Sequence, residues 1–405
     1  TNNASVADAS PTHQGEQKSV STAPIFDIDP KALWADPYPT LAEMRRSAPI
    51  AYVPQLDATL MVRRDDIAAN EKKIEVFASV QPDGLMTRLM GQNMMRKDGR
   101  EHRAERKAIF PAISPRAVRE VWRQAFEDMA DRVLAELRPA GRADMAADIS
   151  RRLAGEALCL VTGLTNMDWQ TMDRVSQGMI DGCANYAGDP AVEAHCVDCV
   201  RAIDEHVLER LPEVRAQPDH SLLSVQHAAG MSDEQNGINI RLAISGGQNE
   251  TRDAIAGTVW ALLSHPAQLA LIRAGEASFA DAFEEYARWL SPIGMSPRRV
   301  AQPYSFGGVD FAPEDRVFFM FSSGNRDEDC FPNPAAFDLR QDCTPAISFG
   351  AGPHFCAGAW ISRCLIGDVV LPRLFDRFEG LRLAGPVPFG GWAFRGPLSM
   401  PVVWD

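Results

Sequence analysis

The feature that most constrains this chain is a run of ten residues, 349–358, with the sequence FGAGPHFCAG. It follows a turn-rich stretch, residues 322–353, whose prolines, glycines and asparagines exclude a long helix. It precedes residues 357–375, whose apolar spacing predicts a helix. A cysteine that enters a helix N-terminus has its thiolate stabilised by the helix dipole and by unpaired backbone N–H groups. We therefore expect Cys356 to remain anionic and to be able to act as a ligand.

This run resembles the haem loop of the cytochrome P450 family, which has Phe and Gly, a second Gly, a basic residue and then Cys-x-Gly at the same spacing. Those six positions would coincide by chance on the order of once in a million chains of this length. The resemblance implies haem b as the cofactor and Cys356 as the iron ligand. It also implies that Phe349 packs against the haem face or the sulfur and that His354 donates to a propionate. The N–H groups of Ala357 and Gly358 are the expected donors to the sulfur.

The spacing of apolar residues predicts a mainly α fold with small β-sheets. Helical periodicity covers five stretches, residues 41–44, 118–137, 145–160, 202–211 and 238–263. Strand-like alternation is found mainly in residues 51–62 and 299–321. The resemblance implies the cytochrome P450 fold, a triangular prism with a long distal helix over the haem. Residues 1–23 are polar and predict a disordered lead-in, and we expect residues 24–405 to form a single haem domain.

Composition excludes several classes of partner. The formal net charge of -13 argues against nucleic-acid binding and against an anionic membrane, because both call for an excess of Lys and Arg. We find no run of about 20 apolar residues and no signal-peptide pattern, which predicts a cytoplasmic protein without a membrane anchor. The eight cysteines are scattered, as is typical of reduced buried thiols. Cys196 and Cys199, beside His195, make only half a zinc site, so we expect a structural role.

A second motif lies upstream, where Glu285 and Arg288 share one face of a predicted helix. Most pairs of this kind are ordinary surface ion pairs. Within the resemblance, they match the family's ExxR pair, which implies a buried charge network that is structural and not catalytic. Arg340 or Arg326 is the expected third member of this network.

The resemblance also supplies candidate partners for the haem propionates. His102 and Arg106 lie four residues apart on a predicted helix and match the family's HxxxR pattern. On residue type alone, this run would be a solvated helix face. Arg299 matches a further propionate partner on the strand after the ExxR helix, and its neighbour Arg298 takes that place if the register shifts by one residue.

The candidate oxygen-activating segment has the sequence GGQNETRD, residues 246–253. A glycine inside a helix costs about 1 kcal/mol relative to alanine, so the pair indicates room for a ligand to approach. Glu250 and Thr251 match the family's acid–alcohol pair, which implies that they relay protons to bound dioxygen. Gln248 replaces a usual glycine and Asn249 adds another amide, so we expect an unusually polar distal site.

These motifs predict a haem-dependent monooxygenase that uses O2 and two electrons from NAD(P)H, delivered by a reductase. Residues 246–253 and 391–397 are similar to bacterial haem domains fused to a reductase and to related aromatic O-demethylases. The expected reaction is hydroxylation or O-dealkylation of a small or medium apolar or aromatic substrate. Two alternatives stay open: a peroxide-driven peroxygenase, which a polar distal site favours, and a non-catalytic haem-thiolate sensor, which needs no acid–alcohol pair.

The expected partners are the substrate, O2 and an electron-donor reductase. Because no reductase sequence is visible, a flavin or 2Fe–2S reductase is expected as a separate protein or as a removed portion of this one. Arg96, Lys97, Arg103 and Lys107 form a candidate basic patch for an acidic partner, or else a solvated helix face. By family position alone, the candidate pocket walls are Ala243, Gly247, Ile293, Met295 and Phe394.

Overall fold

The computed structural model describes residues 21–405. Most of the predicted lead-in, residues 1–23, lies outside the described residues. Its last part is folded, because the N–H of Thr22 donates to the carbonyl of Asp310 at 3.1 Å and Ala23 is buried against the sheet core. The ordered part of the domain therefore begins before residue 24.

Helices make up most of the described chain, in agreement with the predicted fold class. Their bounds are α1 (Pro30–Ala35), α2 (Tyr38–Ser47), α3 (Arg64–Asn70), α4 (Leu85–Met90), α5 (Gly99–Ile113), α6 (Pro115–Ala117), α7 (Arg123–Leu137), α8 (Arg151–Thr162), α9 (Trp169–Cys183), α10 (Pro190–Ala216), α11 (Leu222–Ala228), α12 (Asp233–Ser245), α13 (Gln248–Ser264), α14 (Pro266–Arg273), α15 (Phe279–Trp289), α16 (Phe321–Gly324), α17 (Ala359–Ser362) and α18 (Leu371–Arg377). A π-helical stretch, Arg363–Val370, joins α17 to α18.

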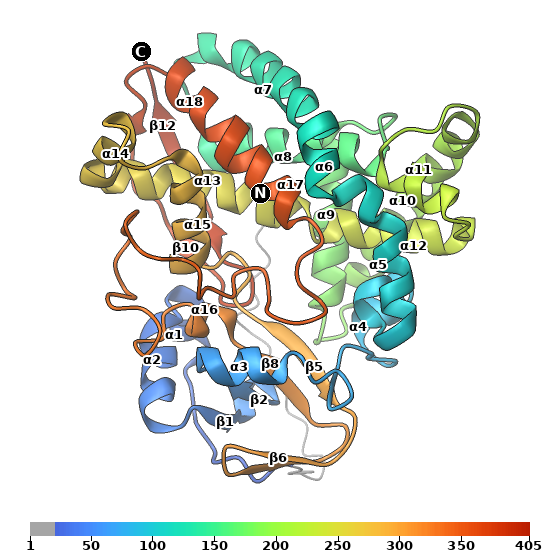
Figure 1. The fold of residues 1–405 in the computed structure, drawn as a ribbon, viewed down its shortest axis with the longest axis vertical. Helices are drawn as coiled ribbons and strands as arrows, with labels where there is room; N and C mark the ends of the chain where they lie inside the picture. The colour runs from blue at the N-terminus through green and yellow to red at the C-terminus, as the bar shows by residue number, and fades with distance from the viewer. Residues whose placement is uncertain (1–20) are drawn as a thin grey trace.

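The strands are short and belong to small sheets. Their bounds are β1 (Ile50–Val53), β2 (Ala58–Met61), β3 (Phe77–Ala78), β4 (Arg142–Asp144), β5 (Ser296–Val300), β6 (Tyr304–Phe306), β7 (Val309–Phe311), β8 (Arg316–Phe319), β9 (Arg382–Leu383), β10 (Phe389–Gly390), β11 (Gly396–Pro397) and β12 (Pro401–Val403). The largest sheet has the order β1-β2-β8-β5-β3, in which only β2 and β8 are parallel. Figure 1 shows this sheet with α1–α3 at one end of the molecule and the helices α5–α14 at the other.

The distal helix is divided in two. The stretch predicted over residues 238–263 forms α12 and α13, separated by Gly246 and Gly247. The two pieces still follow one another in direction, and a sharp bend of 98° comes only after Ser264. A side chain at Gly247 would place its Cβ 2.6 Å from the carbonyl oxygen of Ala243, so this break requires glycine. The break lies immediately before Glu250.

Within residues 21–405, no single helix has the length and hydropathy needed to cross a bilayer. The helical run Asp233–Ser264 reaches that composition only when it is taken together with Pro266–Arg273, across the 98° bend.

Candidate haem-thiolate site

The loop of residues 349–358 folds back on itself ahead of α17. The N–H of Cys356 donates to the carbonyl of Phe349 at 2.8 Å, and the N–H of Phe355 donates to that of Gly352 at 3.0 Å. Burial raises the pKa of the Cys356 thiol, whereas a hydrogen bond from the N–H of Gly358 lowers it. This N–H is one of the two sulfur donors expected from the sequence. The sulfur is thereby placed at the start of the helical segment that α17 begins.

Cys356 borders an internal space. Its side chain is exposed, and yet burial within the protein is the main cause that raises the pKa of its thiol. A side chain that lines a cavity inside the fold has both properties. Besides Gly358, the groups that act on the thiol are Glu250, which raises its pKa, and the cations of Arg106 and Arg363, which lower it. Glu250 and Arg106 therefore lie close to the sulfur, on helices α13 and α5.

Glu71 connects the thiolate loop to the sheet. It is 2% exposed, and its carboxylate accepts a hydrogen bond of 2.6 Å from the N–H of Ala351 and one of 3.2 Å from Arg298. A side chain at Gly352 would place its Cβ 2.6 Å from the carbonyl oxygen of Glu71. The loop can therefore approach the end of α3 this closely only because residue 352 is glycine. Glu71 could not be identified from the sequence, because a single acidic residue after a short helix carries no recognisable signal.

A polar cluster lies at one edge of the internal space. His354 and Asp98 form a contact of 2.8 Å, and the ring of His102 stacks on that of His354 with centroids 4.0 Å apart. Burial, followed by the influence of the neighbouring His354 and Arg106, lowers the pKa of His102 to about 4. His102 is therefore a neutral hydrogen-bonding group near pH 7 and not a cation.

Arg106 is a cation that faces the internal space. Burial lowers its pKa, and the thiol of Cys356 acts in the opposite direction. Among residues 21–405, its side chain forms no ion pair within 4.0 Å and no hydrogen bond to protein. The predicted HxxxR pair is thus close to the sulfur and available to an anionic ligand.

The structure corrects the choice between the two neighbouring arginines of β5. Arg298 is 4% exposed, faces inward toward Glu71, and its Nε is sealed without a partner. Arg299 points the other way, where it donates to the carbonyl of Val80 and pairs with Glu314. Strand alternation turns adjacent residues to opposite faces, so Arg299, the residue predicted for a propionate, does not face the internal space.

The opposite wall of the space is formed by α13. Burial is the main cause that raises the pKa of Glu250 to about 7; the nearby Asp253 adds to this effect and Arg252 opposes it. Oε2 of Glu250 is sealed and has no hydrogen-bond partner among the described residues. Thr258, about two turns of helix further on, bonds its hydroxyl to the carbonyl four residues before it, but Thr251 has no such bond in this part of the chain.

The predicted polar distal site is wrong for Gln248 and Asn249. Both side chains are turned away from Cys356: Gln248 donates to the carbonyl of Arg151 and to Asp173, and Asn249 donates to Gln177. They fix α13 to α8 and α9. Helical geometry accounts for this, since residues at neighbouring positions point about 100° apart around the axis.

The ExxR pair is buried, as predicted. Arg288 donates to both oxygens of Glu285 at 2.7 Å, and the exposed fractions of the two side chains are 0% and 1%. The expected third arginine is wrong, because Arg340 pairs with Glu276 at the surface and Arg326 donates to the carbonyl of Trp289. The network is completed by backbone carbonyls that accept from Arg288, those of Asn325, Pro334 and Ala336.

The candidate pocket walls lie in two places. Ala243 and Gly247 are partly buried at the break between α12 and α13. Ile293 and Phe394 are joined by an isolated antiparallel bridge, and Met295 packs with the core between the sheet and α2. The structure therefore groups these residues into two separate walls.

The candidate basic patch is only partly present. Arg96 is buried, and Lys97 forms an ion pair with Glu105, so neither contributes a free surface charge. Arg103 and Lys107 are exposed on α5. The predicted patch of four cations is thus reduced to two.

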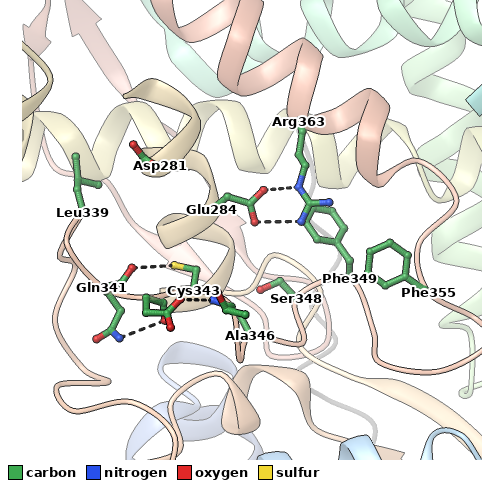
Figure 2. Close-up of a pocket in the computed structure, with 12 residues that line it drawn as sticks. Asp281, Glu284, Leu339, Gln341, Cys343, Ala346, Ser348, Phe349, Phe355 and Arg363 are labelled. Atoms are coloured by element: carbon green, nitrogen blue, oxygen red, sulfur yellow. Dashed lines mark hydrogen bonds and ion pairs between the residues drawn. The ribbon is translucent and has the colours of Figure 1, made fainter. Parts of the chain in front are cut away.

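A pocket of about 510 Å³ lies on the outer side of the thiolate loop. Figure 2 shows Glu284 and Arg363 joined by two contacts there, with Phe349 and Phe355 beside them. The guanidinium of Arg363 lies over the ring of Phe349 at 4.7 Å. This pocket is separate from the internal space, because neither Cys356 nor any residue of α13 lines it.

The two remaining cysteines of interest are packing residues. Cys196 and Cys199 are fully buried where α10 packs on α9. Added Cβ atoms on Gly182 and Gly178 would meet their sulfurs at 2.5 Å and 2.4 Å. The helices approach closely at these glycines, and the thiols fill the contact.

The internal space fits haem b in chemistry. One wall carries a thiol with a backbone N–H donor, the edge carries the cations Arg106 and Arg298, and the opposite wall carries the unpartnered acid Glu250. Arg106 is a largely buried cation without a protein partner among the described residues, and such a cation calls for an anionic ligand. A planar group with an iron centre and two carboxylates meets these requirements.

Comparisons with known proteins agree with this geometry. Residues 281–383 match the family described as Cytochrome P450. The chain is 28% identical to nocardicin C N-oxygenase of Nocardia uniformis subsp. tsuyamanensis, over 93% of this chain and 97% of that protein. It is 27% identical to 6-deoxyerythronolide B hydroxylase of Saccharopolyspora erythraea, over 89% and 93%. The crystal structure of CalO2 superposes with a TM-score of 0.85 at 24% identity, over 94% of this chain and 99% of that one.

Proposed function

We propose that this chain, which belongs to the cytochrome P450 family and is a haem-dependent monooxygenase, hydroxylates or O-dealkylates a small or medium apolar or aromatic substrate. In this proposal the two electrons come from NAD(P)H through a flavin or 2Fe–2S reductase. Relatives named for oxygenation and hydroxylation, along nearly their whole length, support the reaction class.

The observation that carries the proposal is the buried, unpaired carboxyl of Glu250, which acts on the pKa of the Cys356 thiol. A carboxyl group with a pKa of about 7 both holds and releases a proton near neutral pH. Its Oε2 is buried and has no partner in the described chain, so this acid is not held by a structural ion pair. A merely structural acid would be paired, as Glu285 is with Arg288.

The residues around the internal space have distinct roles in this proposal. Haem b, when bound, supplies the activation of dioxygen by an iron with a thiolate ligand. Cys356 provides that ligand, and the N–H of Gly358 tempers the charge on its sulfur. Arg106 holds the propionates as a cation, and Arg298, whose N–H groups are bonded to or enclosed by protein atoms, adds its positive charge nearby. His102 and His354 hold the propionates as hydrogen-bond donors, since burial and neighbouring charge keep His102 neutral.

The proton path begins at Glu250. Its carboxyl holds a proton at Oε2 and passes it, directly or through ordered water, to the hydroxyl of Thr251. That hydroxyl is not tied to the helix backbone, so it is able to donate toward the internal space. Because Glu250 is buried, its proton is kept from bulk water until it is transferred.

A peroxygenase and a non-catalytic sensor are the two alternatives. The polar distal site that favoured a peroxygenase is lost, because Gln248 and Asn249 bond to α8 and α9. A sensor has no use for an unpaired buried acid such as Glu250. The proposal therefore rests on reductive oxygen activation.

The test compares two ways of driving the reaction. A panel of apolar and aromatic compounds is first screened by the shift of the Soret band from low spin to high spin. Compounds that bind are then incubated with NAD(P)H and a surrogate ferredoxin system, or with hydrogen peroxide alone. Product formed only with NAD(P)H and O2 supports the proposal. Product formed as fast with peroxide alone identifies a peroxygenase, and no product in either case identifies a sensor.

A further inference from the structure

Arg96 is a buried arginine that none of these roles uses. It ends a short 3-10 helix, Met94–Arg96, and is 6% exposed. Within residues 21–405, its side chain forms no ion pair and no hydrogen bond. Burying a cation without a partner is costly, so the fold retains Arg96 at a position where a negatively charged ligand is the missing partner.

The guanidinium of Arg96 borders open space. Two other buried arginines, Arg298 and Arg395, have an Nε that protein atoms seal without a partner. The side-chain nitrogens of Arg96 also have no protein partner among the described residues, but protein atoms do not enclose them. Its nitrogens are therefore accessible from within the protein and can receive a small polar group.

Electrostatic neighbours locate this guanidinium. Burial and the cation of Arg298 lower the pKa of Arg96 to about 10, while Cys183, Tyr186 and Asp98 raise it. Arg96 is therefore still a cation at neutral pH. The residues that act on it place it between β5 and the end of α9. None of the influences on Arg96 comes from residues 349–358, whereas Cys356 acts on Arg106.

The segment between α9 and α10 lies over this position. It contains Tyr186, whose ring is 74% exposed and lies 5.8 Å from the guanidinium of Arg316 at the start of β8. The segment thus reaches from the helices to the sheet. α9 also bonds to α13 through Gln177 and Asn249, so the helix whose end lies near Arg96 contacts the helix that carries Glu250.

We infer that Arg96 binds a carboxylate of the substrate, so that this enzyme acts on apolar or aromatic acids in preference to neutral molecules. The inference rests on the proposed function, since it names the substrate class of the same site. A guanidinium offers two parallel N–H donors that match the two oxygens of a carboxylate. Arg106, His102 and His354 are the proposed donors to the propionates, and the N–H groups of Arg298 are bonded to or enclosed by protein atoms. This leaves Arg96 for a second carboxylate.

The test measures binding to the ferric holoenzyme by Soret titration. The probes are para-methoxybenzoate and its neutral counterpart para-methoxybenzamide, with decanoate and decanamide as an aliphatic pair. We expect the wild-type protein to bind at least one acid about 10-fold or more tightly than its amide, and Arg96→Met to weaken acid binding by about 10- to 100-fold. Amide binding should change by less than about threefold, and Arg96→Lys should retain part of the preference.

Two controls separate a binding role from other roles. Arg88→Met removes an exposed cation on α4 and should leave the preference for acids unchanged. Transfer of haem to excess apomyoglobin should be as slow in Arg96→Met as in the wild type. Faster haem loss together with an unchanged acid preference would mean that Arg96 holds a propionate, and this overturns the inference.

The inference and the proposed function fail in different ways. Ferric binding needs no electrons, so equal or absent binding of acids by the wild-type protein overturns the carboxylate site even when turnover with the reductase succeeds. Conversely, a preference for acids that depends on Arg96 supports the site even when no product forms with NAD(P)H.

Discussion

Arg288 and Glu285 form an ion pair with two hydrogen bonds of 2.7 Å, and the pair is inaccessible to water. Arg288 also donates to three carbonyls of the turn-rich segment that leads to the thiolate loop. One guanidinium thus fixes α15 to the segment that positions Cys356. The pair supports the site from outside, and its role is structural.

Removing the planar fork of Arg288 should therefore destabilise the whole haem domain. Lysine cannot make the same five bonds, so it leaves buried carbonyls without partners and takes hydrogen bonds from the carboxylate of Glu285. We expect Arg288→Lys to lower the free energy of unfolding by about 3–5 kcal/mol and to lower haem content. Urea unfolding and haem absorbance measure these effects. Arg340→Lys, at the exposed pair with Glu276, should change stability by less than about 1 kcal/mol, and an equal loss in both variants would contradict the assignment.

The iron ligand is tested by spectroscopy. Cys356→His replaces a thiolate with a neutral imidazole, so we expect it to abolish the red-shifted ferrous–CO band that a thiolate ligand produces. Cys330→Ser, which changes a partly buried thiol in the turn-rich segment, should keep that band. Persistence of the band in Cys356→His would show that another residue ligates the iron.

Local motifs could be predicted from the sequence better than side-chain directions. The thiolate loop and the ExxR pair depend on spacing along a few residues, and the structure places both as expected. Arg298 and Arg299 could not be separated, because their directions depend on the phase of β5, which pairing with β8 sets. Gln248 and Asn249 were misplaced for the same reason, since their partners Asp173 and Gln177 come from a distant helix.

Residues that act only through tertiary contacts were missed altogether. Glu71 reaches Ala351 and Arg298, both more than two hundred residues away in the chain. The sequence predicted Arg96 to be part of a basic surface patch, because a sequence shows charge but not burial. Contacts of this range are set by the packing of α3 and β5 around the loop.

The hydroxyl of Thr251 is expected to control how oxygen is used. Thr251→Ala removes the hydroxyl of the proposed proton path, so we expect more hydrogen peroxide released and less product formed per NAD(P)H consumed. Thr258→Ala is the matched control, because the hydroxyl of Thr258 bonds only to the carbonyl of Ala254 on the same helix. Coupling that is unchanged in Thr251→Ala would remove Thr251 from the proton path.

The raised pKa of Glu250 should also be visible in stability. Its ordinary value of 4.5 rises to about 7 in the folded protein, mainly through burial. A carboxyl group whose pKa is higher in the folded state takes up a proton on folding, so the wild-type protein loses stability as the pH rises from about 4.5 to about 7. Above that window the ionised group costs on the order of 3 kcal/mol.

Glu250→Gln removes the ionisable group while keeping its size. We therefore expect the Tm of the variant holoenzyme to exceed that of the wild type at pH 8, and the difference to shrink strongly at pH 5, where Glu250 is protonated in the folded state. Thermal unfolding followed by circular dichroism at the two values of pH measures this. Glu234→Gln, at an exposed position of α12, should show no such dependence. A Tm difference that is the same at both values of pH would mean that Glu250 does not titrate between them, and its role as a proton donor near neutral pH would have to be abandoned.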